Sequence, residues 1–341
     1  MRFLKKTMLL AVAFCLFGIG LQAQSSLKRA NKQYELKAFN LAIKSYQKVL
    51  SKQENNVGAL TGIADSYRHL NQMTQAAEYY ERAVQQRKVN QEAFLNYGKT
   101  LKAIGQYDEA KKWFNRYAQK YPADGRQYAA SCDFAKEHRN DAALFEVVNE
   151  YINTSGSDFG ATMFGTAAVY SSTRNDILKE GTTKNNWTNS TGSHLYFTTS
   201  DGSGYLKPPT YVHDNINSNV NQGPVAYSSD GRWVAITKNN FVEGSRQIPS
   251  SGIELSLYIA DVTSGGNWKG SKALPFNGSG YSTGYPCFSP DGNTLYFASD
   301  RPDGFGGFDI YISRRTGNTW SAPENAGAII NSAGNEISPF F

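Results

Sequence analysis

A repeat of 34 residues runs through the first part of the chain and constrains its fold more than any other feature. Small residues recur in two columns at this spacing: Ala30, Ala64 and Gly98, and Ala42, Ala76 and Ala110. An aromatic column follows with the same period at Tyr46, Tyr80 and Phe114. Small residues let two helices approach closely while aromatic side chains fill the next layer, so the spacing predicts three helix pairs stacked into a solenoid.

The third unit carries the fullest version of the pattern. Its diagnostic positions are Phe94, Gly98, Leu101, Ala110, Phe114 and Pro122. Over 24–124 the chain therefore resembles tetratricopeptide repeats (TPR). Residues 125–138 place Cys132 in the Ala64 and Gly98 column, and we expect them to form the capping helix that such an array needs. The predicted helical domain spans 24–138.

The TPR resemblance implies a peptide-binding groove lined by the first helix of each pair. Projecting the groove columns of the family onto this chain selects Asn31, Tyr34, Asp65, Arg68, Lys99 and Lys102. The three cations among them suit an acidic peptide or a carboxylate. A solvated helix face is the alternative interpretation of the same residues.

From about residue 145 the pattern changes to that of strands. Four segments share a start: 158–165, 223–237, 285–300 and 337–341. Their aligned positions are Ala161, Pro224, Pro286 and Pro339. Ser-Asp-Gly at 229–231 and Pro-Asp-Gly at 290–292 predict hairpin turns between apolar strands. The spacing predicts a partial β-propeller of about three four-stranded blades over 157–341, after a linker at 139–156 with a first strand at 145–152.

Residues 285–341, which include the run FASDRPDGFGGFDIYISRRTGNTWSAPENAGAIINSAGNEISPFF, resemble a blade of TolB-type, WD-like propellers. The whole of 24–341 resembles Bacteroidota envelope proteins that join TPR repeats, this propeller and an OmpA-type peptidoglycan-binding domain. That family includes the periplasmic component of type IX secretion and gliding machinery. The resemblance implies a scaffold for envelope proteins or peptides, with any peptidoglycan link made by a C-terminal part that the chain lacks. Since a closed propeller needs at least four blades, we expect a truncated one.

The first 23 residues have the features of a cleavable signal peptide. Arg2, Lys5 and Lys6 form a basic start, and an apolar run from Met8 to Leu21 follows. Val12-Ala13-Phe14 lacks the small residues of a lipidation site, so lipidation at Cys15 is not expected. Because no later stretch is apolar enough to span a bilayer, we expect a mature periplasmic protein without a transmembrane helix, with outer-membrane association left open.

The charge balance argues against a nucleic-acid partner. Residues 24–138 carry 19 Lys and Arg against 11 Asp and Glu, a net charge of +8, and residues 139–341 carry 13 against 18, a net charge of −5. This excess of positive charge is modest, and an exported protein meets little nucleic acid. The asymmetry favours two surfaces with different partners.

Catalytic, metal-binding and cofactor-binding patterns are weak. Ser282 lies in a G-x-S-x-G string, but no histidine follows it in the sequence. The four histidines form no zinc-ligand pair, and the spacing of Asp300, Asp303 and Asp309 does not match a calcium loop. We therefore expect a protein that is not an enzyme and has no metal or cofactor, and we expect Cys132 and Cys287 to be buried free thiols.

The predicted fold class is multidomain α plus β, a TPR α-solenoid followed by a partial β-propeller. The favoured function is that of a periplasmic scaffold or adaptor. A glycan- or peptide-binding propeller of an outer-membrane system is the alternative. A propeller-lidded hydrolase is disfavoured, because the chain lacks the Ser–Asp–His order.

Overall fold

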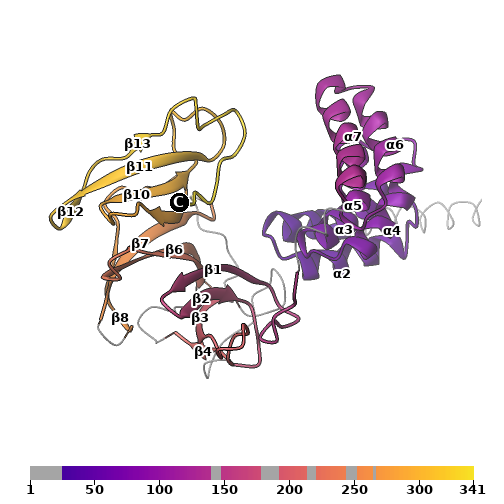
Figure 1. Ribbon diagram of the computed structural model, residues 1–341. Helices are drawn as coiled ribbons and strands as arrows, with labels where there is room; N and C mark the ends of the chain where they lie inside the picture. The colour runs from indigo at the N-terminus through magenta and orange to yellow at the C-terminus, as the bar shows by residue number, and fades with distance from the viewer. Residues whose placement is uncertain (1–24, 140–146, 178–191, 213–219, 243–251, 264–265) are drawn as a thin grey trace, which may run out of the picture. The chain divides into compact units, whose positions relative to one another are not determined.

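The chain divides into two compact units, a helical one and one built of strands, with the boundary between Val147 and Val148. The computed structural model describes residues 25–139, 147–177, 192–212, 220–242, 252–263 and 266–341. Figure 1 shows both units, which are called the helical unit and the β unit below. The predicted signal peptide and Cys15 lie outside the described residues.

The helical unit consists of three helix pairs and a final helix. Residues 25–35 form the first helix. The others are α2 (Phe39–Leu50), α3 (Val57–His69), α4 (Met73–Val84), α5 (Gln91–Ala103), α6 (Tyr107–Ala118) and α7 (Pro122–Glu137). The predicted capping helix is thus present and begins at Pro122, three residues before the predicted start. Proline suits the first turn of a helix because no intrahelical partner is needed for its missing N–H.

Helix starts repeat with the same 34-residue period as the core. The side chain of Asn56 accepts a hydrogen bond from the backbone N–H of Ala59 at the start of α3, at 3.0 Å. Asn90 accepts one from Ala93 in the same way at the start of α5, at 2.9 Å. Each cap satisfies a backbone donor that would otherwise lack a partner in the first turn.

The small and aromatic columns meet in the core of the helical unit. All members of the aromatic column are almost fully buried, and both alanine columns are inaccessible to solvent. A Cβ atom on Gly98 would lie 2.6 Å from Cε1 of Phe114, which shows how closely α5 and α6 approach. The predicted role of the small residues as helix contacts is therefore confirmed.

The β unit contains three antiparallel sheets. The strands of the first are β1 (Asp158–Phe164), β2 (Ala167–Ser172), β3 (His194–Thr199) and β4 (Thr210–Tyr211). The second contains β5 (Val220–Tyr227), β6 (Trp233–Val242), β7 (Leu255–Val262) and β8 (Trp268–Ala273). The third contains β9 (Thr283–Phe288), β10 (Thr294–Ser299), β11 (Asp309–Thr316), β12 (Thr319–Trp320) and β13 (Glu324–Asn325).

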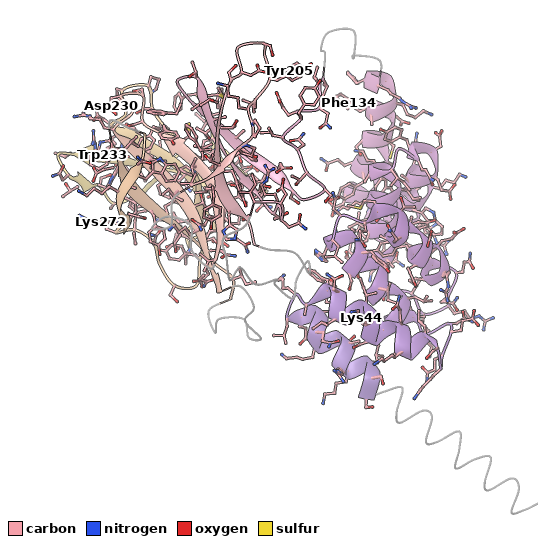
Figure 2. The ribbon with its side chains drawn as sticks, turned by 90° about the horizontal axis from the view of Figure 1, so that it is seen from below. Lys44, Phe134, Tyr205, Asp230, Trp233 and Lys272 are labelled. Atoms are coloured by element: carbon pink, nitrogen blue, oxygen red, sulfur yellow. The ribbon has the colours of Figure 1, made fainter. Side chains whose placement is uncertain are left out.

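Successive strands pair in order in the first two sheets, and β9 to β12 do so in the third, with β13 also pairing with β11. The predicted turns are confirmed: 229–231 joins β5 to β6, and 290–292 joins β9 to β10. Gly231 and Gly292 have φ values of 66° and 69°, which glycine adopts without a steric penalty. In Figure 2, Asp230 and Trp233 mark the first of these turns.

The first strands of the three sheets pack against their neighbours, β1 on β5 and β5 on β9. One apolar core lies between the first and second sheets and includes Leu195, Val225 and Ile236. Another lies between the second and third sheets and includes Leu257 and Phe297. Among the described residues the sheets do not close into a ring, so the fold observed is a helical TPR-like region followed by a β-rich region.

Two expectations differ from the structure. No strand is present over 147–152, the described part of the strand predicted at 145–152, because no neighbouring strand hydrogen-bonds to this segment. Cys132 and Cys287 are free thiols, but only Cys132 is buried and Cys287 is partly exposed, because it lies on the face of the third sheet away from the core.

Candidate functional site

The six predicted groove residues occupy two columns on the first helix of each pair. Asn31, Asp65 and Lys99 form one column, and Tyr34, Arg68 and Lys102 form the other. The two columns are three residues apart, which places them on one face of each helix. The structure thus arranges the six residues on corresponding faces of the helix at 25–35, α3 and α5.

Asn31 and Asp65 are bound to the aromatic column of the core. The hydroxyl of Tyr46 donates to Oδ1 of Asn31 at 2.9 Å, and the hydroxyl of Tyr80 donates to Oδ1 of Asp65. Burial is the main reason that the pKa values of both tyrosines are raised, so both remain donors at neutral pH. These two groove positions therefore hold the helix pairs together.

Asp65 makes more polar contacts than any of the other five predicted groove residues. Nδ2 of Asn96 on α5 donates to its Oδ1 at 3.1 Å, and the Arg68 guanidinium lies 3.8 Å from the same oxygen. Since Arg68 already faces a carboxylate, its charge is partly neutralised. Arg68 is therefore the weakest of the three predicted cations as an anion-binding group.

Tyr34 belongs to an aromatic cluster with His69. Its hydroxyl lies 3.2 Å from Nε2 of His69, and the imidazole stacks on Phe39 with ring centroids 4.6 Å apart. Burial raises the pKa of Tyr34 to about 12, and burial lowers the pKa of His69. His69 directly follows Arg68 of a groove column but belongs to no recognised motif, so the sequence did not single it out as a groove residue.

The third pair differs because Phe114 replaces the tyrosine of the first two pairs. Phe114 has no hydroxyl, and Lys99 stands where Asn31 and Asp65 accept a hydrogen bond. The Lys99 ammonium instead lies over the ring of Tyr128 on α7, 4.8 Å from its centroid. Nζ of Lys102 donates to Oγ of Ser131 on α7 at 2.8 Å.

Lys99 and Lys102 open onto a cavity of about 350 Å³ between α5, α6 and α7. It is lined by Lys99, Lys102, Ala103, Tyr107, Phe114, Tyr128 and Ala135. Both lysines are half-buried, and no described residue forms an ion pair with either. We call this the lysine cavity. It combines two ammonium groups with aromatic and methyl surface, which suits a carboxylate attached to an apolar group.

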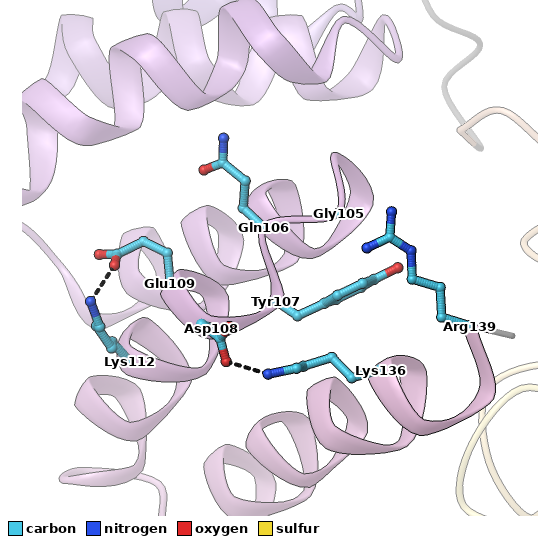
Figure 3. A pocket seen from close by; sticks show the side chains of 8 residues that line it. All are labelled: Gly105, Gln106, Tyr107, Asp108, Glu109, Lys112, Lys136 and Arg139. Carbon is cyan, nitrogen blue, oxygen red and sulfur yellow. Dashed lines mark hydrogen bonds and ion pairs between the residues drawn. The ribbon is translucent and has the colours of Figure 1, made fainter.

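A second cavity of about 380 Å³ is also lined by Tyr107 (Figure 3). Lys136 donates to Asp108 at 2.8 Å and Lys112 to Glu109 at 2.6 Å, so two of its three cations are paired. The hydrogen bond from Lys136 holds the pKa of Asp108 below its usual value. Because four of its five charged groups are paired with one another, this cavity is a poorer candidate for an anion than the lysine cavity.

The other residues considered as catalytic or metal-binding candidates show no such site among the described residues. Ser282 is buried, and its Oγ accepts a hydrogen bond from the backbone N–H of Leu255 at 3.2 Å. Burial raises the pKa of both Cys132 and Cys287, which disfavours the reactive thiolate. No group of three or more His, Cys, Asp or Glu in the described segments is placed to hold a metal ion. His213 lies outside them.

Comparison with known proteins establishes the class of the helical unit. Two family models described as tetratricopeptide repeat match the chain, one over residues 27–88 and the other over 68–132. Residues 27–132 therefore contain TPR repeats, as the 34-residue period predicted. Stacked helical repeats present extended binding surfaces for proteins, so this region has the character of a protein-interaction scaffold.

Several solved TPR domains are similar to 34–39% of the chain. The first TPR domain of Spaghetti (RPAP3), bound to an HSP90 peptide, is 21% identical, covering 34% of this chain and 93% of that chain with a TM-score of 0.32. The Sgt2 TPR domain of Aspergillus fumigatus is 18% identical, covering 39% and 91% with a TM-score of 0.32. The second TPR domain of human RPAP3, in complex with an HSP70 peptide, is 19% identical, covering 34% and 98% with a TM-score of 0.32.

No curated protein matches the chain. Within the described residues, no helix combines the length and the apolar character needed to cross a bilayer.

Proposed function

We propose that this protein is an exported adaptor that binds an acidic segment of a partner protein in the groove of its helical unit. The observation that carries the proposal is the lysine cavity, where Lys99 and Lys102 face aromatic surface and have no carboxylate partner among the residues that the structure describes. A peptide carboxylate placed there gains two charge-assisted contacts, while an adjacent apolar side chain packs on Tyr128. Of the six predicted groove residues, these two lysines are therefore the principal ligand contacts.

The other four predicted residues shape the groove in this proposal. Asn31 and Asp65 are held by tyrosines of the core, and Asp65 in turn faces Arg68. Tyr34 offers an aromatic edge at the opposite end of the array. A bound segment thus meets cations beside α5 and α7 and mainly aromatic and amide groups beside the first helix.

The β unit is, in this proposal, a partial propeller that presents a second surface to partners. Three successive antiparallel sheets, with β1, β5 and β9 packed on one another, support that interpretation. The signal-peptide pattern at 1–23 and the blade resemblance over 285–341 support a place in the periplasm, in a type IX secretion or cell-wall-linked assembly. The adaptor acts by binding and does not turn over a substrate.

The test is binding of the full chain to the synthetic peptide SGLEELEE with a free C-terminal carboxylate, measured by isothermal titration calorimetry. Loss of both lysine contacts in Lys99→Ala/Lys102→Ala is expected to weaken binding about 10- to 100-fold, the range for charged hydrogen bonds. Binding should also weaken as salt rises, because exposed charge pairs are screened.

The matched control is Lys44→Ala, which removes an exposed lysine from α2 (Figure 2) and should leave the affinity unchanged. The uncharged peptide SGLQQLQQ with an amidated C-terminus should bind far more weakly. Equal binding of both peptides, or equal effects of the control and the double variant, would contradict the proposal.

A further inference from the structure

An arginine lies at the same position in the first and third sheets of the β unit. Arg174 follows the end of β2 by two residues, and Arg301 follows the end of β10 by two residues. Since β3 pairs with β2 in the same register as β11 pairs with β10, both arginines meet a tyrosine of the next strand. Cζ of Arg174 lies 5.3 Å from the ring centroid of Tyr196, and Cζ of Arg301 lies 4.7 Å from that of Tyr311. The equivalent residue of the second sheet is Asn240, so that sheet places an amide at this position.

The charge of Arg174 is paired within the chain. Its Nε donates to Oδ1 of Asp176 at 2.8 Å, its Nη2 donates to Oδ2 at 2.7 Å, and its Nη1 donates to the hydroxyl of Tyr170 at 2.7 Å. The hydrogen bond to Asp176 is the main reason that the pKa of Arg174 is raised. A carboxylate that accepts two hydrogen bonds therefore offsets the cost of burying this guanidinium, which is 4% exposed.

Arg301 contacts no carboxylate in the described part of the chain. Its Nε donates to Oγ of Ser299 at 3.1 Å, and its Nη2 lies 3.4 Å from the backbone oxygen of Phe276 and 3.5 Å from Oγ1 of Thr283. These acceptors are neutral, and the two contacts of Nη2 are long for hydrogen bonds. Burial lowers the pKa of Arg301. Its half-buried charge is therefore less well compensated than that of Arg174.

Two acidic residues adjoin Arg301 in the sequence, but neither pairs with it in the structure. Asp303 lies two residues later, as the carboxylate partner of Arg174 does, yet Asp303 is exposed and its φ is 71°. Oδ1 of Asp300 accepts a hydrogen bond from the backbone N–H of Ser282 at 2.5 Å. The neighbouring acids therefore leave the guanidinium without an ion pair.

Three aromatic rings hold the guanidinium of Arg301 in place. Its Cζ lies 5.2 Å from the ring centroid of Tyr281, 5.5 Å from that of Phe297 and 4.7 Å from that of Tyr311. Phe297 stands where Tyr170 offers its hydroxyl to the arginine of the first sheet, and a phenyl ring has no such acceptor. Ring faces attract a cation without using its N–H groups. Nη1 of Arg301 therefore keeps its donors, because it has no hydrogen-bond partner among the described residues and is not buried.

We propose that Arg301, held between Tyr281 and Tyr311, forms a carboxylate-binding site of the β unit. Nη1 and Nη2 present one end of the guanidinium fork, where a carboxylate replaces the long contacts of Nη2 with charge-assisted hydrogen bonds. The carboxylate belongs either to a small molecule or to an acidic side chain of a partner polypeptide. This inference deepens the proposed function, whose second surface it locates. It does not depend on the lysine cavity, so either site can fail while the other holds.

The test follows the Nε–Hε signals of the full chain, carrying ¹⁵N-labelled arginine, as sodium acetate is added and sodium chloride keeps the ionic strength constant. Arg301→Lys identifies the Arg301 signal by its loss. We expect a saturable shift of that signal with a dissociation constant on the order of 1–10 mM. The Arg174 signal is the internal control and should not shift, because Asp176 already binds that guanidinium.

Two peptides distinguish the sources of the carboxylate, and both are tested on Lys99→Ala/Lys102→Ala so that the lysine cavity does not contribute. Tighter binding of acetyl-GSDSG-amide than of acetate indicates an acidic side chain of a partner polypeptide. Equal or weaker binding of this peptide indicates a small carboxylate. The uncharged acetyl-GSNSG-amide should not shift the Arg301 signal.

Asp303→Asn is the matched control variant, and it should leave the affinity of Arg301 for acetate unchanged. Tighter acetate binding in this variant would show that Asp303 is the partner of Arg301 in solution and would overturn the proposal. No saturable shift of the Arg301 signal, or an equal shift with sodium chloride alone, would overturn it as well.

Discussion

Replacing Gly98 by alanine should destabilise the helical unit, although alanine is the better helix former. The added Cβ would lie 2.6 Å from Cε1 and 2.7 Å from Cδ1 of Phe114, well inside van der Waals contact. Phe114 is fully buried and stacks on Tyr128 with centroids 5.3 Å apart, so its ring has little room to move. The clash therefore cannot be relieved by rotating an exposed side chain.

The magnitude follows from two opposing effects. Overpacking a tight core costs about 1–3 kcal/mol. Removing glycine from a helix interior returns about 0.5–1 kcal/mol. Taking the middle of each range, the expected result for Gly98→Ala is a net loss of about 1 kcal/mol in the free energy of unfolding. This holds even though Ala30 and Ala64 occupy the same column in the other repeats.

Urea unfolding of the full chain, followed by circular dichroism at 222 nm, measures this change. Gly58→Ala is the matched control, because its new Cβ would meet Asn56 and Leu27 at 3.6–3.8 Å, an ordinary contact. It should be neutral or stabilising by about 0.5 kcal/mol. Phe114→Leu should reduce the cost of Gly98→Ala in a double-mutant cycle. If Gly98→Ala were as stable as the unaltered chain, the close-packing argument for the small column would be refuted.

Three further predictions concern single side chains. Burial lowers the pKa of His194 to about 4, so the unfolded state binds a proton more readily than the folded state, and the free energy of unfolding should fall by about 1–2 kcal/mol between pH 7 and 5. His194→Gln should make the free energy of unfolding, measured by urea titration, less dependent on pH. The same pH dependence in the variant and the unaltered chain would contradict this prediction. Tyr80→Phe should cost about 1–2 kcal/mol, since Asp65 loses a buried donor, and equal urea midpoints would show that the hydrogen bond contributes nothing. Gly292→Ala should cost about 1 kcal/mol because φ is 69° in the turn after β9, and thermal unfolding of the two chains should differ accordingly.

The helical architecture was predictable from the sequence because its cause is local and periodic. Each repeat places a small residue, such as Ala64 or Gly98, opposite an aromatic one, and this spacing can be read directly from the sequence. Asn56 and Asn90 cap helices 34 residues apart for the same reason. The turns at 229–231 and 290–292 were also predictable from the sequence, because each needs a residue with positive φ and glycine occupies that position.

Other features depend on contacts between distant residues, which a pattern in one segment does not show. The β-prone run at 145–152 contains valine and tyrosine, but its described part has no strand to pair with. Asp65 was predicted as a ligand contact, whereas Tyr80 and Asn96, which lie 15 and 31 residues further along the chain, already use its carboxylate.

The lysine cavity illustrates the same limit. Lys99 and Lys102 were predicted from their columns, but part of the cavity wall comes from Tyr128 and Ala135 on α7. Ser131 on the same helix accepts a hydrogen bond from Lys102. Sequence reasoning assigned that helix only a capping role. The partners of the two lysines therefore became visible only in the folded structure.

Binding of an acidic segment in the lysine cavity can be tested by hydrogen exchange of the full chain with and without SGLEELEE. We expect slower exchange at the end of α5, near Lys99 and Lys102, and in α7, near Tyr128 and Ser131, with exchange in the three sheets unchanged. Protection confined to the β unit, or no protection at α5 and α7 at saturating peptide, would contradict it.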